Sequence, residues 1–221
     1  MIEVRASKLG GCVRSYLYDM KLGEPELPAR TKLIFAIGKA LEPVVMEHAG
    51  FPLEFLTHDT VEIRDTMLTG VVLTGHPDGE DEDSIYEIKT MRGAAYRAMK
   101  KHGLAAQFPQ YLIQAACYVV HRNKKGVRFL CLDKDSSEIH NEYFTLEELA
   151  PYYGKALYNA QTIHIWSLKK GNRYPQRDED LPSWRCSPAY CRHTHCRFHF
   201  TKRKPKPKKS LTSKKKSSTT K

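Results

Sequence analysis

Residues 75–90 read GHPDGEDEDSIYEIKT and bring three charged residues, Asp78, Glu87 and Lys89, close together in the chain. Its second half, SIYEIKT, has the β-branched and aromatic composition of a strand. Because side chains alternate across a strand, Glu87 and Lys89 share one face, while Tyr86 and Ile88 share the other, which we expect to face the core. The sequence therefore places a carboxylate and an ammonium group together on one side of a strand.

A third charged residue, Asp78, stands at the start of the run PDGEDED, where the preceding strand is expected to end and a turn to begin. A hairpin-like return of the chain would bring Asp78 beside Glu87, and the repulsion between two carboxylates should raise the pKa of one of them. Mg²⁺ or Mn²⁺ removes this repulsion, because these ions prefer carboxylate, carbonyl and water oxygens. Lys89 over the same site can orient a water molecule or offset transition-state charge, which indicates metal-assisted hydrolysis of a phosphate ester. As a pattern alone, these charges also fit a solvated strand face.

The rest of the chain predicts helices around such strands. Apolar spacing predicts a helix at 6–23 with Ser7 as its N-cap, and another at 31–50 that Pro43 should kink or restart. The other expected elements are helices at 93–103, 108–122 and 146–171, the last interrupted near Pro151, and strands at 60–74, 84–90 and on both sides of a turn in 126–146. This order indicates an α/β fold with a mixed sheet flanked by helices.

Four short motifs follow one another along the chain. They are GKALE at 38–42 (G-x-x-x-E), the G-x-x-D of 75–78, the E-x-K of 87–89, and QAACY at 114–118 (Q-x-x-x-Y) on a predicted helix. In this order they resemble the PD-(D/E)XK nuclease superfamily, and within it the RecB-like branch. The resemblance implies a restriction-endonuclease-like core, with a central mixed β-sheet flanked by helices.

The resemblance also implies a role for each matching residue. The implied metal ligands are three carboxylates and one backbone carbonyl, those of Glu42, Asp78, Glu87 and Ile88. Lys89 would position the nucleophilic water or stabilise the negative charge of the phosphorane-like transition state. Gln114 and Tyr118 would orient Lys89, the substrate phosphate or the scissile strand; a surface residue and a half-buried core aromatic are the alternatives for this pair.

Two further assignments have alternatives. Pro43 directly after Glu42 departs from a regular helix, so nearby Glu47 or His48 could replace Glu42 as a ligand. Four basic residues on the helix after the site could contact the DNA backbone or form a solvated face: Arg92, Arg97, Lys100 and Lys101.

The C-terminal segment SWRCSPAYCRHTHCRF at 183–198 is rich in cysteine. This arrangement of one early and three late cysteines resembles that of the iron–sulfur nucleases of this branch. They include the AddB-type helicase-nucleases and the CRISPR-associated protein four. The resemblance implies a 4Fe–4S cluster that pins residues 184–200 to the N-terminal helix through four thiolates, those of Cys12, Cys186, Cys191 and Cys196. The family usually has two residues between its first two late cysteines, whereas this chain has four.

Zinc is the alternative occupant, with His193, His195 or His199 as substitute ligands, and unligated thiols are a third reading. The remaining cysteines, Cys117 and Cys131, stand in apolar runs and are expected in the core.

The positive charge is concentrated at one end of the chain. Residues 201–221 hold ten Lys and Arg and no acid, which leaves 26 basic and 25 acidic residues in 1–200, a net charge of +1 out of +11. We therefore expect a nuclease domain at 1–200 and a disordered Lys-rich tail at 201–221. The tail would attract nucleic-acid phosphates, or serve as a solubilising terminus or, in a eukaryotic host, as a nuclear address.

Residues 1–11, MIEVRASKLGG, contain no apolar run of the length that a signal peptide needs, and the sequence has no run of 18 apolar residues. We therefore expect an intracellular, cytoplasmic protein associated with DNA and not with a membrane. The expected partners are single-stranded DNA or DNA ends, together with proteins of recombination or CRISPR adaptation.

The leading hypothesis is a Mg²⁺- or Mn²⁺-dependent deoxyribonuclease, an exonuclease on single strands or ends, in recombination, repair, phage DNA processing or CRISPR adaptation. One alternative is a non-catalytic DNA-binding protein that retains the fold. Another is a zinc-stabilised interaction protein whose carboxylates are incidental.

The predicted cluster has a spectroscopic test. Protein purified without oxygen should be coloured and should absorb near ~400 nm, where thiolate-to-iron charge transfer is expected. A colourless preparation that elemental analysis finds to hold zinc or no metal would rule the cluster out.

Overall fold

The structure is a computed structural model that describes residues 1–57, 59–171 and 174–176 and the single positions 186, 191, 193 and 196. The chain divides into two units, Met1–Leu181 and Pro182–Lys221, and each is described by itself. All helices and strands with described bounds belong to the first unit. The expected tail at 201–221 lies outside the described residues.

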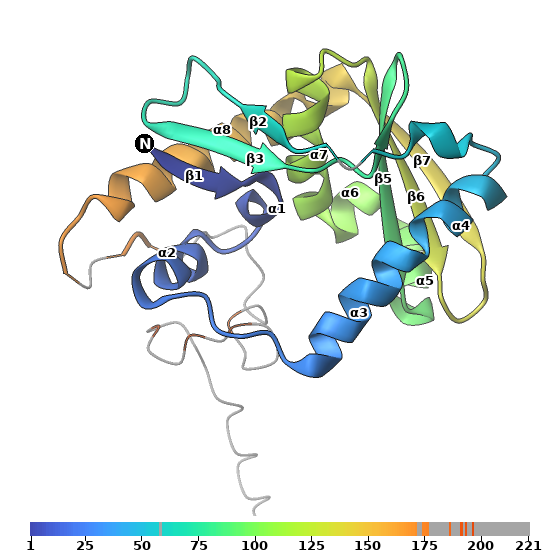
Figure 1. Ribbon diagram of the computed structural model, residues 1–221, viewed down its shortest axis with the longest axis horizontal. Coiled ribbons are helices and arrows are strands. Elements are labelled where there is room, and N and C mark those ends of the chain that lie inside the picture. Colours follow the sequence, from blue (N-terminus) through green and yellow to red (C-terminus); the bar gives the residue numbers. More distant parts are fainter. Residues whose placement is uncertain are drawn as a thin grey trace, which may run out of the picture. The chain divides into compact units, whose positions relative to one another are not determined.

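The described strands form two hydrogen-bonded sheets (Figure 1). The first has the order β1-β3-β2 and consists of β1 (Ile2–Arg5), β2 (Val61–Ile63) and β3 (Val71–Gly75). The second has the order β4-β5-β6-β7 and consists of β4 (Gly79–Glu80), β5 (Ser84–Met91), β6 (Gly126–Asp133) and β7 (Ile139–Thr145). Both sheets are mixed, because β1–β3 and β5–β6 are parallel pairs and the other pairs are antiparallel. The predicted mixed α/β architecture is confirmed, with its strands divided between two sheets.

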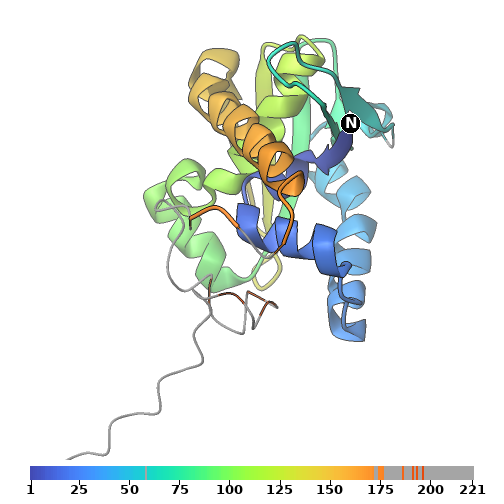
Figure 2. The same ribbon diagram turned by 90° about the vertical axis from the view of Figure 1, so that its left-hand side faces the viewer.

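Helices cover both faces of the larger sheet. The helices are α1 (Ala6–Leu9), α2 (Val13–Leu22), α3 (Ala29–Ala40), α4 (Glu42–His48), the 3₁₀ turn η1 (Leu53–Phe55), α5 (Gly93–His102), α6 (Leu104–Gln107), α7 (Pro109–His121) and α8 (Leu146–Ser167). Figures 1 and 2 show α3 and α4 on one side of the β4–β7 sheet and α8 on the other.

The alternation of side chains along β5 determines which helices pack on each face of this strand. Tyr86 and Ile88 pack into a small cluster with Val45 and Met46 of α4. The opposite face of β5 contributes to the main core, which includes much of α7 and α8. The face that carries the charged residues therefore looks toward α7.

Three predicted helix features are wrong. The helix expected at 6–23 is broken between α1 and α2, and the residues at the N-cap positions are Arg5 and Cys12, not Ser7. The break lets Gly10 pack tightly on α7, since a Cβ there would lie 2.4 Å from the Cβ of Gln110. Pro151, expected to interrupt the last helix, lies inside a continuous α8.

The other predicted elements occur with changed bounds. The helix expected at 31–50 ends at Ala40 and restarts at Glu42, as the proline after Glu42 indicated. The strand expected at 60–74 is two strands, β2 and β3. Strands β1 and β4 and helix α6 were not predicted. No helix in the described part of the chain is long and apolar enough to cross a membrane.

Gly10→Ala tests the close approach of α1 to α7. The added Cβ would lie 2.5 Å from the Cα of Gln110, so backbone must shift, and we expect the free energy of unfolding to fall by about 1–3 kcal/mol. Gly154→Ala in α8 is the matched control: nothing lies within 4 Å of its added Cβ, so helix propensity should raise the free energy of unfolding by about 1 kcal/mol. Denaturant titration followed by circular dichroism measures both, and an unchanged value for Gly10→Ala would contradict the packing.

Candidate active site

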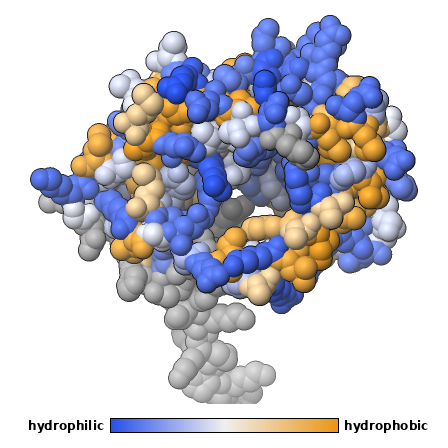
Figure 3. All heavy atoms as spheres, viewed as in Figure 1, coloured by the Kyte–Doolittle hydropathy of each residue, from blue (hydrophilic) through white to orange (hydrophobic). Residues whose placement is uncertain are grey.

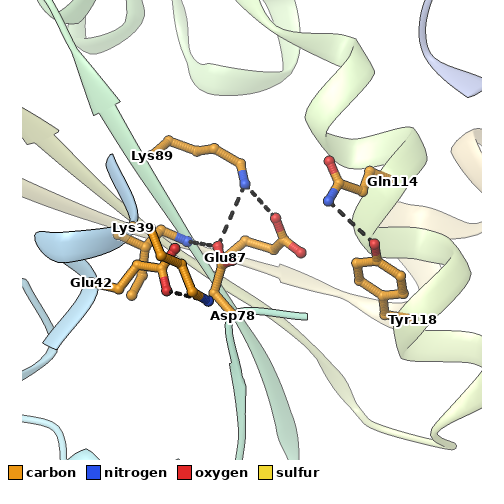
Figure 4. Close-up of polar contacts among 8 residues, drawn as sticks. Lys39, Glu42, Asp78, Glu87, Lys89, Gln114 and Tyr118 are labelled. Atoms are coloured by element: carbon orange, nitrogen blue, oxygen red, sulfur yellow. Dashed lines mark hydrogen bonds and ion pairs between the residues drawn. The ribbon is translucent and has the colours of Figure 1, made fainter. Parts of the chain in front are cut away.

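Three charged side chains converge on β5 (Figure 4). Nζ of Lys89 lies 2.5 Å from Oε2 of Glu87 and 3.6 Å from Oδ2 of Asp78. The Glu87 side chain is fully buried, and that of Lys89 is 16% exposed. The predicted convergence of Asp78, Glu87 and Lys89 is therefore present in the structure.

The turn before β5 holds Asp78 in place. Strands β4 and β5 form an antiparallel hairpin in which Gly79 pairs with Tyr86, so the chain returns as the sequence indicated. The backbone N–H of Ile88 donates a hydrogen bond of 2.7 Å to Oδ2 of Asp78. Asp81 also has a structural role, because its carboxylate accepts hydrogen bonds from the backbone of Ser84 and from the Tyr86 hydroxyl.

Glu42 is the acidic residue of α4 that reaches the cluster. Its side chain is 12% exposed and lies 2.9 Å from Nζ of Lys39, one helical turn earlier. Burial raises the pKa of Glu42, the bond from Lys39 lowers it, and the nearby Asp78 carboxylate raises it again. The alternatives Glu47 and His48 are both exposed.

The charges of the central pair follow from burial and proximity. Burial raises the pKa of Glu87 to about 7, while the Lys89 ammonium lowers it and the Asp78 carboxylate raises it. Burial alone would lower the pKa of Lys89, but Glu87 and Asp78 raise it by more, so the ammonium stays protonated. The predicted rise of one carboxyl pKa thus falls on Glu87, with burial rather than repulsion as its main cause.

Helix α7 contributes the second wall of the site. Nε2 of Gln114 donates a hydrogen bond of 3.3 Å to the hydroxyl of Tyr118, and the described hydrogen bonds do not link either residue to Lys89. Tyr118 is buried and its hydroxyl lies against Gly75, where an added Cβ would come within 2.2 Å. Burial raises the pKa of the Tyr118 hydroxyl, and the nearby Glu87 carboxylate raises it too. Tyr118 is therefore both a core residue and a neighbour of the charged cluster.

Sequence reasoning missed two residues beside the cluster. Nζ of Lys89 lies 5.4 Å from the ring centroid of Tyr111, within the range of a cation–π contact. Tyr111 stands three residues before Gln114, so helical spacing could have placed both on one face. The same spacing could have paired Lys39 with Glu42.

The donor atoms of Glu42, Asp78 and Glu87 are of the kind that binds a hard cation. Among the described residues no group of three His, Cys, Asp or Glu side chains is placed to hold a metal ion. In this arrangement Lys89 contacts Glu87 and Lys39 contacts Glu42. However, Oε1 of Glu87 is buried with no hydrogen-bond partner, and such an orphaned oxygen calls for a proton or a cation. Glu42, Asp78 and Glu87 offer only oxygen ligands, the kind that Mg²⁺ and Mn²⁺ prefer.

The cysteines expected to hold a cluster fall in both units. Cys12 is the residue before α2 in the first unit, and the other three, Cys186, Cys191 and Cys196, belong to the second. No disulfide joins the cysteines of the chain, all of which are described. The four-cysteine site stays a prediction, and its alternative ligands His195 and His199 lie outside the described residues. Cys117 and Cys131 are buried core residues, and burial raises the pKa of each thiol to about 12.

The basic residues expected to contact DNA lie on and before α5. Arg92 is the N-cap residue of the helix. The other three, Arg97, Lys100 and Lys101, line a cavity of about 480 Å³ together with Tyr96, Asp133, Ser136 and Glu138. Lys100 pairs with Glu138 inside this cavity, so its charge is partly neutralised within the chain.

No protein-family model and no curated protein sequence matches the chain. Solved structures share its fold: that of SSO0001 has a TM-score of 0.53 and 18% identity, over 86% of this chain and 82% of that one. The alkaline exonuclease LHK-Exo from Laribacter hongkongensis has a TM-score of 0.52 and 16% identity, over 75% and 89% of the two chains. Its complex with dAMP gives a TM-score of 0.53 and 16% identity, over 74% and 89%. The predicted restriction-endonuclease-like fold is therefore confirmed.

Mn²⁺ should raise the midpoint of thermal unfolding, because a ligand that binds only the folded state stabilises it. Asp78→Asn should remove most of this rise, whereas Glu82→Gln, which changes an exposed acid in the same turn, should leave it intact. The rise should grow between about pH 6 and about pH 8, because the Glu87 carboxyl must lose its proton to bind a cation. Thermal melts with and without Mn²⁺ measure this, and an equal rise in Asp78→Asn would place the metal elsewhere.

Proposed function

We propose that the chain is a metal-dependent DNA nuclease that hydrolyses phosphodiester bonds, and that it acts as an exonuclease on single strands or DNA ends. The observation that carries the proposal is the Lys89 ammonium held between the carboxylates of Glu87 and Asp78, with Glu42 beside them. A protein that only binds DNA has no need of buried carboxylates next to an ammonium, since they repel phosphates and are costly to desolvate. The fold shared with an alkaline exonuclease, and the dAMP bound to that enzyme, support the same class of substrate.

The side chains of this chain have distinct parts in the proposed reaction. Glu42, Asp78 and Glu87, with the carbonyl of Ile88, would hold Mg²⁺ or Mn²⁺, which when bound supplies Lewis-acid stabilisation of charge on the phosphate. Lys89 keeps its proton and donates to a phosphoryl oxygen or to the attacking water. Hydrolysis adds this water across the P–O bond and leaves one phosphate end and one hydroxyl end.

The rest of the proposal concerns residues outside the central cluster. Gln114 and Tyr118 would position the scissile strand beside Lys89. Backbone phosphates would be contacted by basic side chains on and before α5, namely Arg92, Arg97, Lys100 and Lys101. We also propose a structural 4Fe–4S cluster on Cys12, Cys186, Cys191 and Cys196, a nuclease domain at 1–200 and a DNA-attracting tail at 201–221.

Lys89→Met should lower the rate of DNA cleavage by about 100-fold or more, because it removes the donor for the developing charge. DNA affinity should stay within about threefold, since the phosphate contacts lie along the whole strand. The matched control is Lys134→Met, which removes an exposed lysine from the turn between β6 and β7 and should cleave like the unchanged protein. Cleavage of 5′- and 3′-labelled single- and double-stranded oligonucleotides, with Mn²⁺ or EDTA, measures the effect.

Two outcomes contradict the proposal. Full activity in Lys89→Met would remove the proposed role of the ammonium. Tight DNA binding without metal-dependent cleavage by the unchanged chain would instead indicate a non-catalytic DNA-binding protein with a nuclease fold.

A further inference from the structure

Helix α3 has an unusual exposure for a helix of this length. None of its residues is buried, although its sequence ARTKLIFAIGKA contains several large apolar side chains. The exposed fractions are 60% for Leu33, 43% for Ile34, 60% for Phe35 and 44% for Ile37. Apolar groups clustered in this way on a surface indicate a contact with another molecule.

One face of α3 leads directly to the candidate active site. At its C-terminal end, Lys39 of α3 lies 2.9 Å from the carboxylate of Glu42, which belongs to the candidate site. A Cβ at Gly38 would lie 3.9 Å from Oγ1 of Thr90, on the face of β5 opposite Lys89. Ile34 and Phe35 stand four and three residues before Gly38, so they lie on the same face one turn further along. This face therefore extends from the carboxylate cluster outward as an apolar surface that carries one aromatic ring.

The surroundings of this face of α3 suit a ligand that carries both negative charges and apolar groups. Helix α3 contains Arg30, Lys32 and Lys39 and no acidic residue. Lys32 pairs with Glu26 and Lys39 with Glu42, so part of this positive charge is neutralised within the chain. Figure 3 shows the molecule hollowed beside the apolar side chains of α3, with hydrophilic side chains along the border of the hollow. Next to the cluster, on α7, the half-buried ring of Tyr111 stacks on Phe108 with ring centroids 5.3 Å apart.

We propose that Ile34 and Phe35 of α3 bind the bases of an unpaired DNA strand whose phosphodiester bond lies at Glu42, Asp78 and Glu87. This inference rests on the proposed function and narrows its substrate to single strands or frayed ends. In a duplex the base faces are stacked on one another, whereas an unpaired base exposes a face that can pack on an aromatic ring. Phosphate contacts alone would need the basic residues of α3 but not its apolar ones.

Phe35→Ala tests the inference, with Tyr158→Ala as the matched control, because Tyr158 is an aromatic residue 65% exposed on α8. Phe35 is itself exposed and alanine favours helices, so the variant should stay folded. The probes are a fluorescent oligothymidylate, a strand of equal length made of abasic sites, and a blunt duplex. Fluorescence anisotropy in EDTA measures affinity without cleavage.

Phe35→Ala should bind the oligothymidylate about tenfold more weakly, which corresponds to the loss of one stacking contact. Its affinity for the abasic strand and the duplex should stay unchanged, and so should the slope of log affinity against log salt, because no phosphate contact is lost. Tyr158→Ala should leave all three affinities unchanged.

Other results would overturn the inference. An equal loss on all three probes would indicate a general change in the protein, and no loss would leave α3 without a role in base binding. If sedimentation shows that the unchanged chain self-associates and Phe35→Ala does not, α3 binds a second copy of the chain. Metal-dependent cleavage that needs Lys89 would persist in these cases, so the proposed function would stand, whereas its absence from the unchanged chain would remove both.

Discussion

The buried ion pair between Glu87 and Lys89 is the constraint on which the site depends. A fully buried carboxylate is unfavourable unless a partner or a cation compensates it, and here the partner stands two residues along the same strand. Strand alternation fixes both side chains on the face of β5 that looks toward α7, while the apolar face packs on α4. Removing Lys89 would raise the pKa of Glu87 further, because the ammonium lowers a pKa that burial and the Asp78 carboxylate hold at about 7.

The remaining parts of the site are held by contacts distant in sequence. The β4–β5 hairpin and the bond from the Ile88 N–H fix Asp78, and the Tyr118 hydroxyl leaves room only for glycine at position 75. One helix, α7, thus supports the core and the segment that leads to Asp78. In contrast, α3 contributes no buried residue, and the binding role proposed for its apolar side chains does not compete with the core.

The sequence allowed the centre of the site to be predicted, because alternation on β5 and a turn before it are local properties. The mixed α/β fold followed from the order of the expected helices and strands. The break at Gly10 was missed because it depends on the approach of Gln110 from α7, 100 residues further along the chain. Pro151 was read as an interruption, but α8 has a capping box at Thr145 and Glu148 and continues through it. Tyr111 was overlooked because a tyrosine at helical spacing resembles a core residue until its distance to Lys89 is known.

Crystals of the whole chain grown with Mn²⁺ would test the central claim most directly, through the anomalous scattering of manganese. We expect an anomalous peak bounded by carboxylate oxygens of Asp78 and Glu87, with the Lys89 ammonium moved away from the Glu87 oxygen that it contacts here. A peak elsewhere in the molecule, or none beside an unchanged Glu87–Lys89 pair, would contradict the assignment of these carboxylates to metal binding.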